Sequence, residues 1–509
     1  MRRVAIVDVG SNTAKLVDFA FEPGAAFRRV DELRANVRLA QGMGEDGLIR
    51  AEPFERGVAA LTTFASYCRA AGVDEVLATA TSAVRAAANG DAFRTAVRER
   101  AGIELRVLSG EDEARVAALA VANALSIRDA TVVDLGGGSV QLSLLSGRRF
   151  VTGASWPLGA VRTTEAFLRA DPPKAKSVRA LARAARGAFA PWFEHHAERG
   201  PRPLVGLGGT LRNLADVDQQ RRGYPLDLLH GYRLGAASLH ALTDELVRLR
   251  SSERAHLPGL NRDRADIIAA GAVVWSELVR ASGADEVIVS GQGLREGLFY
   301  PHLVPEGDHL LDDLRAFSVR NLLRQYQAES AHDEHVRTLA WQLFDQTASL
   351  HGLGAWEREL LGAAALLHAV GMAIDGYRHD HHGKTLVLGR ALPGFDHREQ
   401  ALVALLVRFH RKGQVADEGL GAVLAPGDLE RVRSLAGMLR VAEYLDRGKA
   451  QRVRAVDVHV GSGVAQIVAL AEGDARLEVE RARDRADLLA SGLGVGVEVV
   501  AGYAVEALR

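Results

Sequence analysis

The sequence predicts a mixed α/β protein in which two similar lobes are followed by a helical domain. One pattern occurs twice: an apolar run rich in β-branched residues, an Asp, a glycine turn and a second apolar run. The copies are centred on Asp8-Val-Gly10 and on Asp134-Leu-Gly136. Beyond about residue 304 the apolar residues recur with the period of amphipathic helices. We therefore expect two related α/β lobes and then a separate all-α region.

Each copy is predicted to form a strand-turn-strand hairpin whose turn can bind phosphate. The glycines let the backbone approach a ligand closely, and the turn amides with Ser11, Asn12 and Ser139 can donate to phosphate oxygens. Asp8 and Asp134 end the first strands, where carboxylates could hold a cation. One such turn is weak evidence, because Asp-x-Gly after a strand is usually an ordinary β-turn. Its recurrence favours a phosphate-binding cleft between the lobes.

Two further glycine turns follow apolar runs. The turn at 206–210 opens a helical stretch at 211–218, and helix N-termini attract anions. The turn at 290–293 leads to Arg295. Both turns fit the same cleft.

In combination, these segments resemble the exopolyphosphatase/guanosine pentaphosphate phosphohydrolase family. The segments that carry the resemblance lie within about the first 300 residues: Asp8-x-Gly10-Ser11-Asn12, 80–85 with Asn89, 108–115, 134–139, 206–210, Arg264-Ala-Asp266 and 290–297. The remaining chain is similar to that of the longer family members. The resemblance implies a duplicated actin-like, ribonuclease H-like core that removes a terminal phosphate from inorganic polyphosphate or from pppGpp.

The resemblance also implies roles for three acidic residues. Glu113 matches the catalytic glutamate and would activate water; it lies in the first turn of a helix that Ser109 can cap, after a strand at 104–108. A Glu there could instead merely complement the helix dipole. Asp8 and Asp134 would hold Mg²⁺ through water, and a monovalent cation such as K⁺ is a further candidate.

The predicted phosphate-binding residues come from the turns and from one helix. They are Ser11, Asn12, Arg85, Gly136, Gly137, Gly138, Ser139, Gly208, Gly209 and Thr210. Arg85 is the expected side-chain clamp, whereas Arg295 is expected to brace the core outside the site. Gln141 stands where the family commonly has Glu, and an amide binds Mg²⁺ less tightly than a carboxylate. The base role therefore falls more firmly on Glu113.

We expect four domains. Residues 1–122 and 123–304 would form the actin-like lobes, 305–450 an all-α, HD-like, non-catalytic domain, and 451–509 a small α/β domain that includes strands at 456–460 and 476–480. The prolines and glycine at 301–307 suggest a linker.

The helical region carries a near-match to the His-Asp metal motif of HD phosphohydrolases. His368 is followed by Ala369 instead of Asp, and His335, His381, His382 and His410 lie elsewhere in the region. Without that carboxylate a two-metal site lacks its hard oxygen ligand. We expect His368 to be a core residue, and the domain to line the substrate path or a dimer interface without binding metal.

Composition limits the partners. The net charge of -1 argues against a nucleic-acid binder, and Cys68, the single cysteine, leaves no internal disulfide, which fits a reducing compartment. The longest apolar stretch, 360–374, is too short to span a bilayer. We expect a cytoplasmic homodimer without a membrane partner. Arg411 and Lys412 could form part of a polyphosphate track, although a solvated helix face is the alternative.

We therefore expect an exopolyphosphatase that requires Mg²⁺ and releases orthophosphate from the end of polyphosphate. A pppGpp 5′-phosphohydrolase would use the same chemistry. More distant alternatives are an ATP-dependent sugar or acetate kinase, because actin-like cores also serve kinases, and a sensor that only binds guanosine phosphates.

Overall fold

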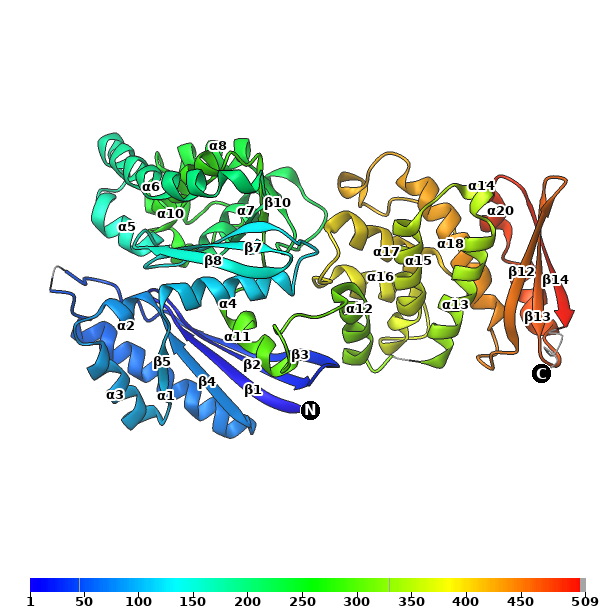
Figure 1. The fold of residues 1–509 in the computed structure, drawn as a ribbon, viewed down its shortest axis with the longest axis horizontal. Helices are drawn as coiled ribbons and strands as arrows, with labels where there is room; N and C mark the ends of the chain where they lie inside the picture. Colours follow the sequence, from blue (N-terminus) through cyan, green and yellow to red (C-terminus); the bar gives the residue numbers. More distant parts are fainter. Residues whose placement is uncertain (45, 329, 504–509) are drawn as a thin grey trace. The chain divides into compact units, whose positions relative to one another are not determined.

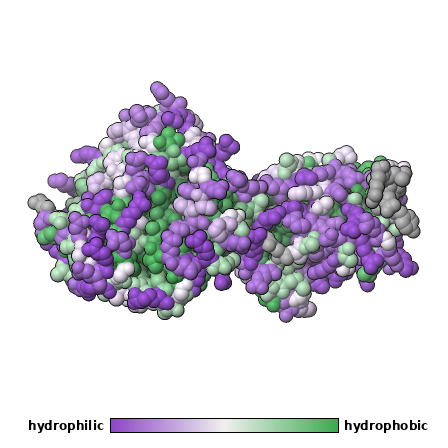
Figure 2. All heavy atoms as spheres, turned by 60° about the horizontal axis from the view of Figure 1, so that its bottom comes forward, coloured by the Kyte–Doolittle hydropathy of each residue, from purple (hydrophilic) through white to green (hydrophobic). Residues whose placement is uncertain are grey.

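The computed structural model describes residues 1–44, 46–328 and 330–503 (Figure 1). These residues form two compact units: the first contains 1–224 with 229–314, and the second contains 225–228 with 315–509. In the space-filling view, hydrophilic residues cover most of the visible face, and hydrophobic residues show between them in smaller areas (Figure 2). No helix in the described part of the chain is long and apolar enough to cross a membrane.

The first unit contains two sheets that share an order of five strands. The first sheet has the order β3-β2-β1-β4-β5, and the second, taken in the same direction, has the order β8-β7-β6-β9-β11 with β10 added antiparallel to β11 at its edge. In each, an antiparallel meander of three strands is extended by parallel strands next to its first strand. The strands are β1 (Arg2–Val9), β2 (Ala14–Glu22), β3 (Ala26–Ala35), β4 (Glu75–Ala80), β5 (Leu105–Val107), β6 (Ala130–Leu135), β7 (Val140–Ser146), β8 (Arg149–Trp156), β9 (Leu204–Leu207), β10 (Arg233–Gly235) and β11 (Glu286–Val289). The duplicated actin-like core expected from the sequence is thus confirmed.

Helices cover both sheets. The bounds in the first unit are α1 (Ala51–Ala71), α2 (Ser82–Ala86), α3 (Gly90–Ala101), α4 (Gly110–Ala122), α5 (Ala160–Phe167), α6 (Ala175–His195), α7 (Gly209–Arg222), α8 (Ala236–Leu246), α9 (Ser251–Arg254), α10 (Ile268–Ser282) and α11 (Leu294–Leu303). The helix α4 follows the first sheet in the chain but packs on β7 and β8 of the second, and α11 follows the second but packs on β1 and β2 of the first (Figure 1). Because Gly297 of α11 has no side chain, α11 can lie directly against Val116 of α4. This exchange places the start of α4 at the junction of the lobes.

The second unit is helical, with a small sheet at its end. Its elements are α12 (Leu314–Gln325), α13 (Ala331–Gln346), α14 (Ala348–His351), α15 (Ala355–Leu367), α16 (His379–Leu388), α17 (His397–Phe409), α18 (Asp428–Leu445), β12 (Val453–Gly461), β13 (Val464–Ala471), α19 (Arg476–Arg483), α20 (Asp487–Leu493) and β14 (Gly496–Tyr503). The strand order is β12-β13-β14. The helical middle and the terminal sheet are as expected, and the four predicted domain ranges stay predictions.

Two local expectations are wrong. Residues 476–480 form part of α19 instead of a strand: Val479 and Ala482, three positions apart, are buried together, and five alternating residues were too few to distinguish the two periods. The predicted linker at 301–307 begins inside α11, which continues through Pro301 to Leu303. Pro301 costs the helix one backbone hydrogen bond, and α11 ends two residues after it.

An aromatic cluster joins α11 to the first sheet. The ring of Phe299 stacks on Phe19 of β2 with 4.2 Å between centroids and contacts Phe21 edge-on. These three side chains are almost fully buried. The cluster therefore stabilises the exchange of helices between the lobes.

We expect Phe299→Ala to lower the free energy of unfolding by about 3–5 kcal/mol, because it removes a buried ring and leaves a cavity. Urea denaturation measures the loss. The control Val30→Ala removes a side chain that is 41% exposed and should change stability by less than about 0.5 kcal/mol. Equal effects of the two substitutions would show that the cluster does not stabilise this contact.

Candidate functional site

A cavity of about 150 Å³ lies where the glycine turns of the two lobes meet. Its walls come from the ends of β1 and β6, from the turns after them and from the first residues of α4 and α7. The predicted site residues that line it are Asp8, Ser11, Asn12, Glu113, Asp134, Gly136, Gly137, Gly138, Ser139, Gly208 and Gly209. The structure therefore brings together most of the predicted phosphate and metal residues, whereas their roles stay predictions.

The two hairpins have equivalent geometry. Asp8 pairs with Lys15 across β1 and β2, and Asp134 pairs with Gln141 across β6 and β7. In each turn a glycine N–H donates to the carbonyl oxygen three residues later, over 3.1 Å from Gly10 and 3.0 Å from Gly136. The recurring sequence pattern therefore encodes one turn, used once per lobe.

The turns face each other so closely that only glycine fits between them. A Cβ at Gly138 would collide with the Oγ atoms of Ser82 and Ser11, which lie 3.0 Å apart. A Cβ at Gly137 would press on Ser11 and Asn12 at 3.3–3.4 Å. The bare backbone of the second turn is thus held beside the side chains of the first.

The third turn opens α7 toward the cavity. Gly208 has φ of +94°, and a Cβ there would collide with the carbonyl of Leu135. Gly209 begins the helix, so its amide lies at the positive end of the helix dipole. The side chain of Thr210 packs against Gly271 of α10, 2.6 Å from where a Cβ at that glycine would lie, and does not line the cavity.

Three carboxyl groups surround the cavity. Burial raises the pKa of Asp134 to about 6 and also raises the pKa of Asp8. Asp8 Oδ1 is buried, and no hydrogen-bond partner for it exists among the described residues. Since a buried oxygen without a partner is costly, and hard divalent cations prefer carboxylate oxygens, this pair fits a cation such as Mg²⁺.

Glu113 is positioned by the N-terminus of α4. Ser109 caps this helix by accepting a 3.0 Å hydrogen bond from the amide of Asp112, as predicted. The Glu113 side chain is 9% exposed, and burial raises its pKa to about 7; the ion pair with Arg85 opposes this rise, and the charges of Asp134 and Asp8 add to it. A carboxyl group that titrates near neutral pH is suited to general base catalysis.

Arg85 lies behind Glu113 and does not line the cavity. Its Nη1 donates to the Glu113 carboxylate and, over 2.5 Å, to the carbonyl oxygen of Leu108. In this structure Arg85 holds a carboxylate in place, whereas we predicted a phosphate clamp.

Four basic side chains line the same cavity and were not among the predicted site residues: Lys15, Arg212, Arg264 and Arg295. Burial, together with the charges of Arg295 and Arg212, lowers the pKa of Lys15 to about 7. Burial and the charge of Arg212 lower the pKa of Arg264 to about 10. Crowded, poorly hydrated cations of this kind would be stabilised by an anionic ligand.

The sequence contained signals for the basic residues that line the cavity, although these residues were not among the predicted site residues. Lys15 interrupts an apolar strand, where a charged residue is unusual, and Arg212 follows a glycine turn by one helical turn. Arg264 belongs to a segment that carried the family resemblance, and Arg295, expected to brace the core, does both: its Nη1 donates to Glu32 over 2.9 Å while it lines the cavity.

Gln141 lines the cavity and is almost fully buried. Its Nε2 donates to Ser139 Oγ over 2.7 Å and to Ser155 Oγ over 3.0 Å. The amide therefore fixes the side chain of one predicted phosphate-binding residue.

In the helical unit the structure corrects the expectation that no carboxylate lies near His368. Asp333 of α13 does: its Oδ1 is 3.7 Å from His368 Nδ1. His335 is not part of this group, because its Nε2 contacts the carbonyl oxygen of Val453 over 2.7 Å. Arg411 and Lys412 follow α17, and Lys412 is exposed; their proposed contact with polyphosphate stays a prediction.

Comparison with known proteins gives a consistent result. The model of the Ppx/GppA phosphatase family matches residues 19–306, and the model of domain III of this family matches residues 314–481. A Ppx/GppA family member from Aquifex aeolicus is 28% identical, with a TM-score of 0.50, over 58% of this chain and 96% of its own. An exopolyphosphatase from Cytophaga hutchinsonii is 23% identical, with a TM-score of 0.57, over 60% of this chain and 99% of its own, and shares the fold.

We expect Gly138→Ala to raise the KM for phosphorylated substrates at least about tenfold, because the new methyl group displaces Ser11 and Ser82 from the turn. Steady-state phosphate release measures this change. Gly187→Ala is the matched control, since a Cβ on that residue of α6 meets no atom within 4 Å. An unchanged KM for Gly138→Ala would show that the turn does not contact the substrate.

Proposed function

Because the chain belongs to the Ppx/GppA phosphatase family, we propose that it is an exopolyphosphatase that hydrolyses the terminal phosphoanhydride of inorganic polyphosphate. The observation that carries this proposal is the position of Glu113, a buried carboxyl group with a pKa of about 7 that lines the same cavity as the glycine turns. Water activation and phosphate binding then take place in one cavity.

The terminal phosphate would bind to the glycine turns. The amides of 137–139 and the N-terminus of α7 supply donors, and the hydroxyl groups of Ser11 and Ser139 are close by. Lys15, Arg212 and Arg264 supply positive charge at the same cavity. Phosphoryl transfer depends mainly on positioning and charge neutralisation, so these groups would stabilise charge on the phosphate oxygens.

Glu113 would accept the proton of the attacking water. Its raised pKa makes the carboxylate a stronger base than a solvated glutamate. Arg85 is a positioning residue in this proposal: it holds one oxygen of Glu113 and is itself anchored to the carbonyl of Leu108.

Asp8 and Asp134 would hold Mg²⁺, which when bound supplies positive charge to the phosphate oxygens. The unpartnered, buried Oδ1 of Asp8 supports this assignment. Gln141 lies opposite Asp134 in the hairpin and contributes no negative charge, so Asp8 and Asp134 would supply the carboxylates of the cation site.

The composition of the cavity wall favours inorganic polyphosphate over pppGpp. The described lining residues include no aromatic ring on which a guanine base could stack, and their apolar side chains are limited to Leu135, Ile267 and Leu294. A substrate made only of phosphate needs neither an aromatic ring nor an extended apolar surface. A pppGpp 5′-phosphohydrolase is the alternative outcome of the test.

The test is phosphate release from long-chain polyphosphate, tripolyphosphate, pppGpp and ATP under identical conditions with Mg²⁺. The proposal requires the highest kcat/KM for polyphosphate. A higher kcat/KM for pppGpp would assign the alternative function, and phosphate transfer from ATP to an acceptor other than water would assign a kinase.

We expect Glu113→Gln to lower kcat on polyphosphate by about 100-fold or more with little change in KM, because the amide keeps the shape of the side chain but cannot accept a proton. The control is Glu111→Gln in the same helical turn, an exposed residue that should leave kcat unchanged. A nearly normal kcat for Glu113→Gln would contradict the assignment of the base.

A further inference from the structure

Four histidines of the helical unit form a continuous row. The centroid distances are 5.3 Å between His332 and His368, 5.2 Å between His368 and His410, and 5.2 Å between His410 and His379. The first three are buried and His379 is half-buried, so the row leads from the interior toward the surface. Histidine is only intermediate in how often it is buried, so a row of adjacent buried histidines is unusual.

All four rings are oriented in the same way. Each Nδ1 lies within hydrogen-bond distance of an oxygen, and an Nδ1–H that donates to this oxygen leaves Nε2 with its lone pair. The acceptors are Asp446 Oδ2 for His332 (2.8 Å), Ala365 O for His368 (2.7 Å), Val407 O for His410 (2.6 Å) and Gly376 O for His379 (3.2 Å). An Nδ1 held by an oxygen while Nε2 stays free is the arrangement of metal-binding histidines.

A buried carboxylate oxygen lies beside this row without a partner. Asp333 is 2% exposed, and its Oδ2 accepts a 2.6 Å hydrogen bond from Ser330 Oγ. Its Oδ1, 3.7 Å from the His368 ring, has no hydrogen-bond partner among the described residues. A buried, unpaired carboxylate oxygen costs free energy unless a cation or donor meets it.

The spacing of these groups suits one ion. One ligand atom each from His332, Asp333 and His368 lies within 4.8 Å of the other two. Bonds of about 2.0–2.2 Å to a tetrahedral metal place the ligand atoms roughly 3.3–3.6 Å apart. Side-chain shifts of about 1 Å or less would therefore close the group around an ion.

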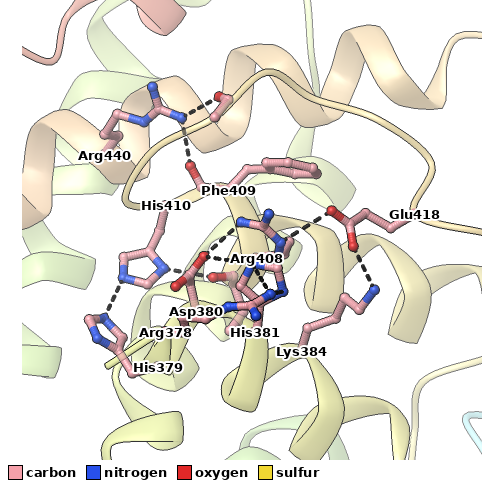
Figure 3. A network of polar contacts seen from close by, with 12 residues as sticks. Arg378, His379, Asp380, His381, Lys384, Arg408, Phe409, His410, Glu418 and Arg440 are labelled. Atoms are coloured by element: carbon pink, nitrogen blue, oxygen red, sulfur yellow. Dashed lines mark hydrogen bonds and ion pairs between the residues drawn. The ribbon is translucent and has the colours of Figure 1, made fainter. Parts of the chain in front are cut away.

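A second contact network fixes the neighbouring part of the row (Figure 3). Arg408 of α17 donates to Asp380 of α16 over 2.7 Å and forms an ion pair with Glu418 at 3.2 Å. These contacts hold α16 against α17, where His379 Nε2 and His410 Nε2 face each other 3.2 Å apart (Figure 3).

We propose that His332, Asp333 and His368 bind a divalent first-row transition metal ion in the helical unit. Two imidazole nitrogens and one carboxylate oxygen suit Mn²⁺, Fe²⁺, Co²⁺ or Zn²⁺ better than Mg²⁺. Asp446 orients His332 from outside the ligand set. Three protein ligands leave at least one position of the ion for water or an exogenous ligand. The proposal is independent of the exopolyphosphatase assignment.

The test uses the full chain without a polyhistidine tag. Elemental analysis after purification without chelators should find about one transition metal ion per chain. Protein stripped with a chelator is then titrated with Co²⁺, whose visible absorption reports nitrogen and oxygen ligands directly. Absence of bound metal together with absence of a saturable Co²⁺ spectrum would overturn the proposal.

Three variants locate the ion. His368→Asn and Asp333→Asn should each weaken Co²⁺ binding at least about 100-fold, and Asp446→Asn, which loses only the orientation of His332, about 10–100-fold. The matched control is His335→Asn on the same helix, which should bind Co²⁺ like the unchanged protein. Circular dichroism verifies that each variant folds. If His368→Asn does not fold, the isosteric Asp333→Asn provides the test of the site. Unchanged Co²⁺ affinity of folded Asp333→Asn would overturn the assignment.

Discussion

The close approach of two glycine turns is the constraint on which the rest of the site depends. Gly137 and Gly138 lie directly against Ser11, Asn12 and Ser82, and a Cβ at Gly138 would collide with two serine Oγ atoms. This contact brings the strand ends of both lobes to one cavity and so places two aspartates beside a buried glutamate. Burial, and to a smaller extent the neighbouring carboxylates, raise the pKa values of Glu113 and Asp134, and a bound cation would oppose this rise.

Acidic and basic side chains occur together in the hairpins that meet at the cavity. Lys15 pairs with Asp8 across one hairpin, and the corresponding position in the other lobe is Gln141. The duplicated turn therefore carries a positive side chain in one lobe and a neutral one in the other. In the proposed function, this asymmetry would suit a ligand that enters between the lobes and meets carboxylates on one side and phosphate-binding donors on the other. An enzyme that splits phosphoanhydrides needs both functions.

The sequence predicted the turns and the helix cap, because residues that are neighbours in the chain determine these features. The hairpin turns and the Ser109 cap follow from the spacing of residues close together in the chain. Contacts between segments far apart in the chain were not predictable in this way. Arg85 meets Glu113 only because α2 and α4 come together, and Asp333 reaches His368 from another helix. The roles of the cavity residues in catalysis stay predictions.

The most direct test of the proposed chemistry is the pH dependence of kcat/KM on polyphosphate. Burial raises the pKa of Glu113 to about 7, so its carboxylate, the basic form, becomes scarcer as the pH falls below that value. We expect kcat/KM of the unchanged protein to fall about tenfold per pH unit below about pH 7 and to level off above it. In Glu113→Gln the residual rate should lack this acid limb. The same limb in both proteins would show that another group activates the water and would contradict the account.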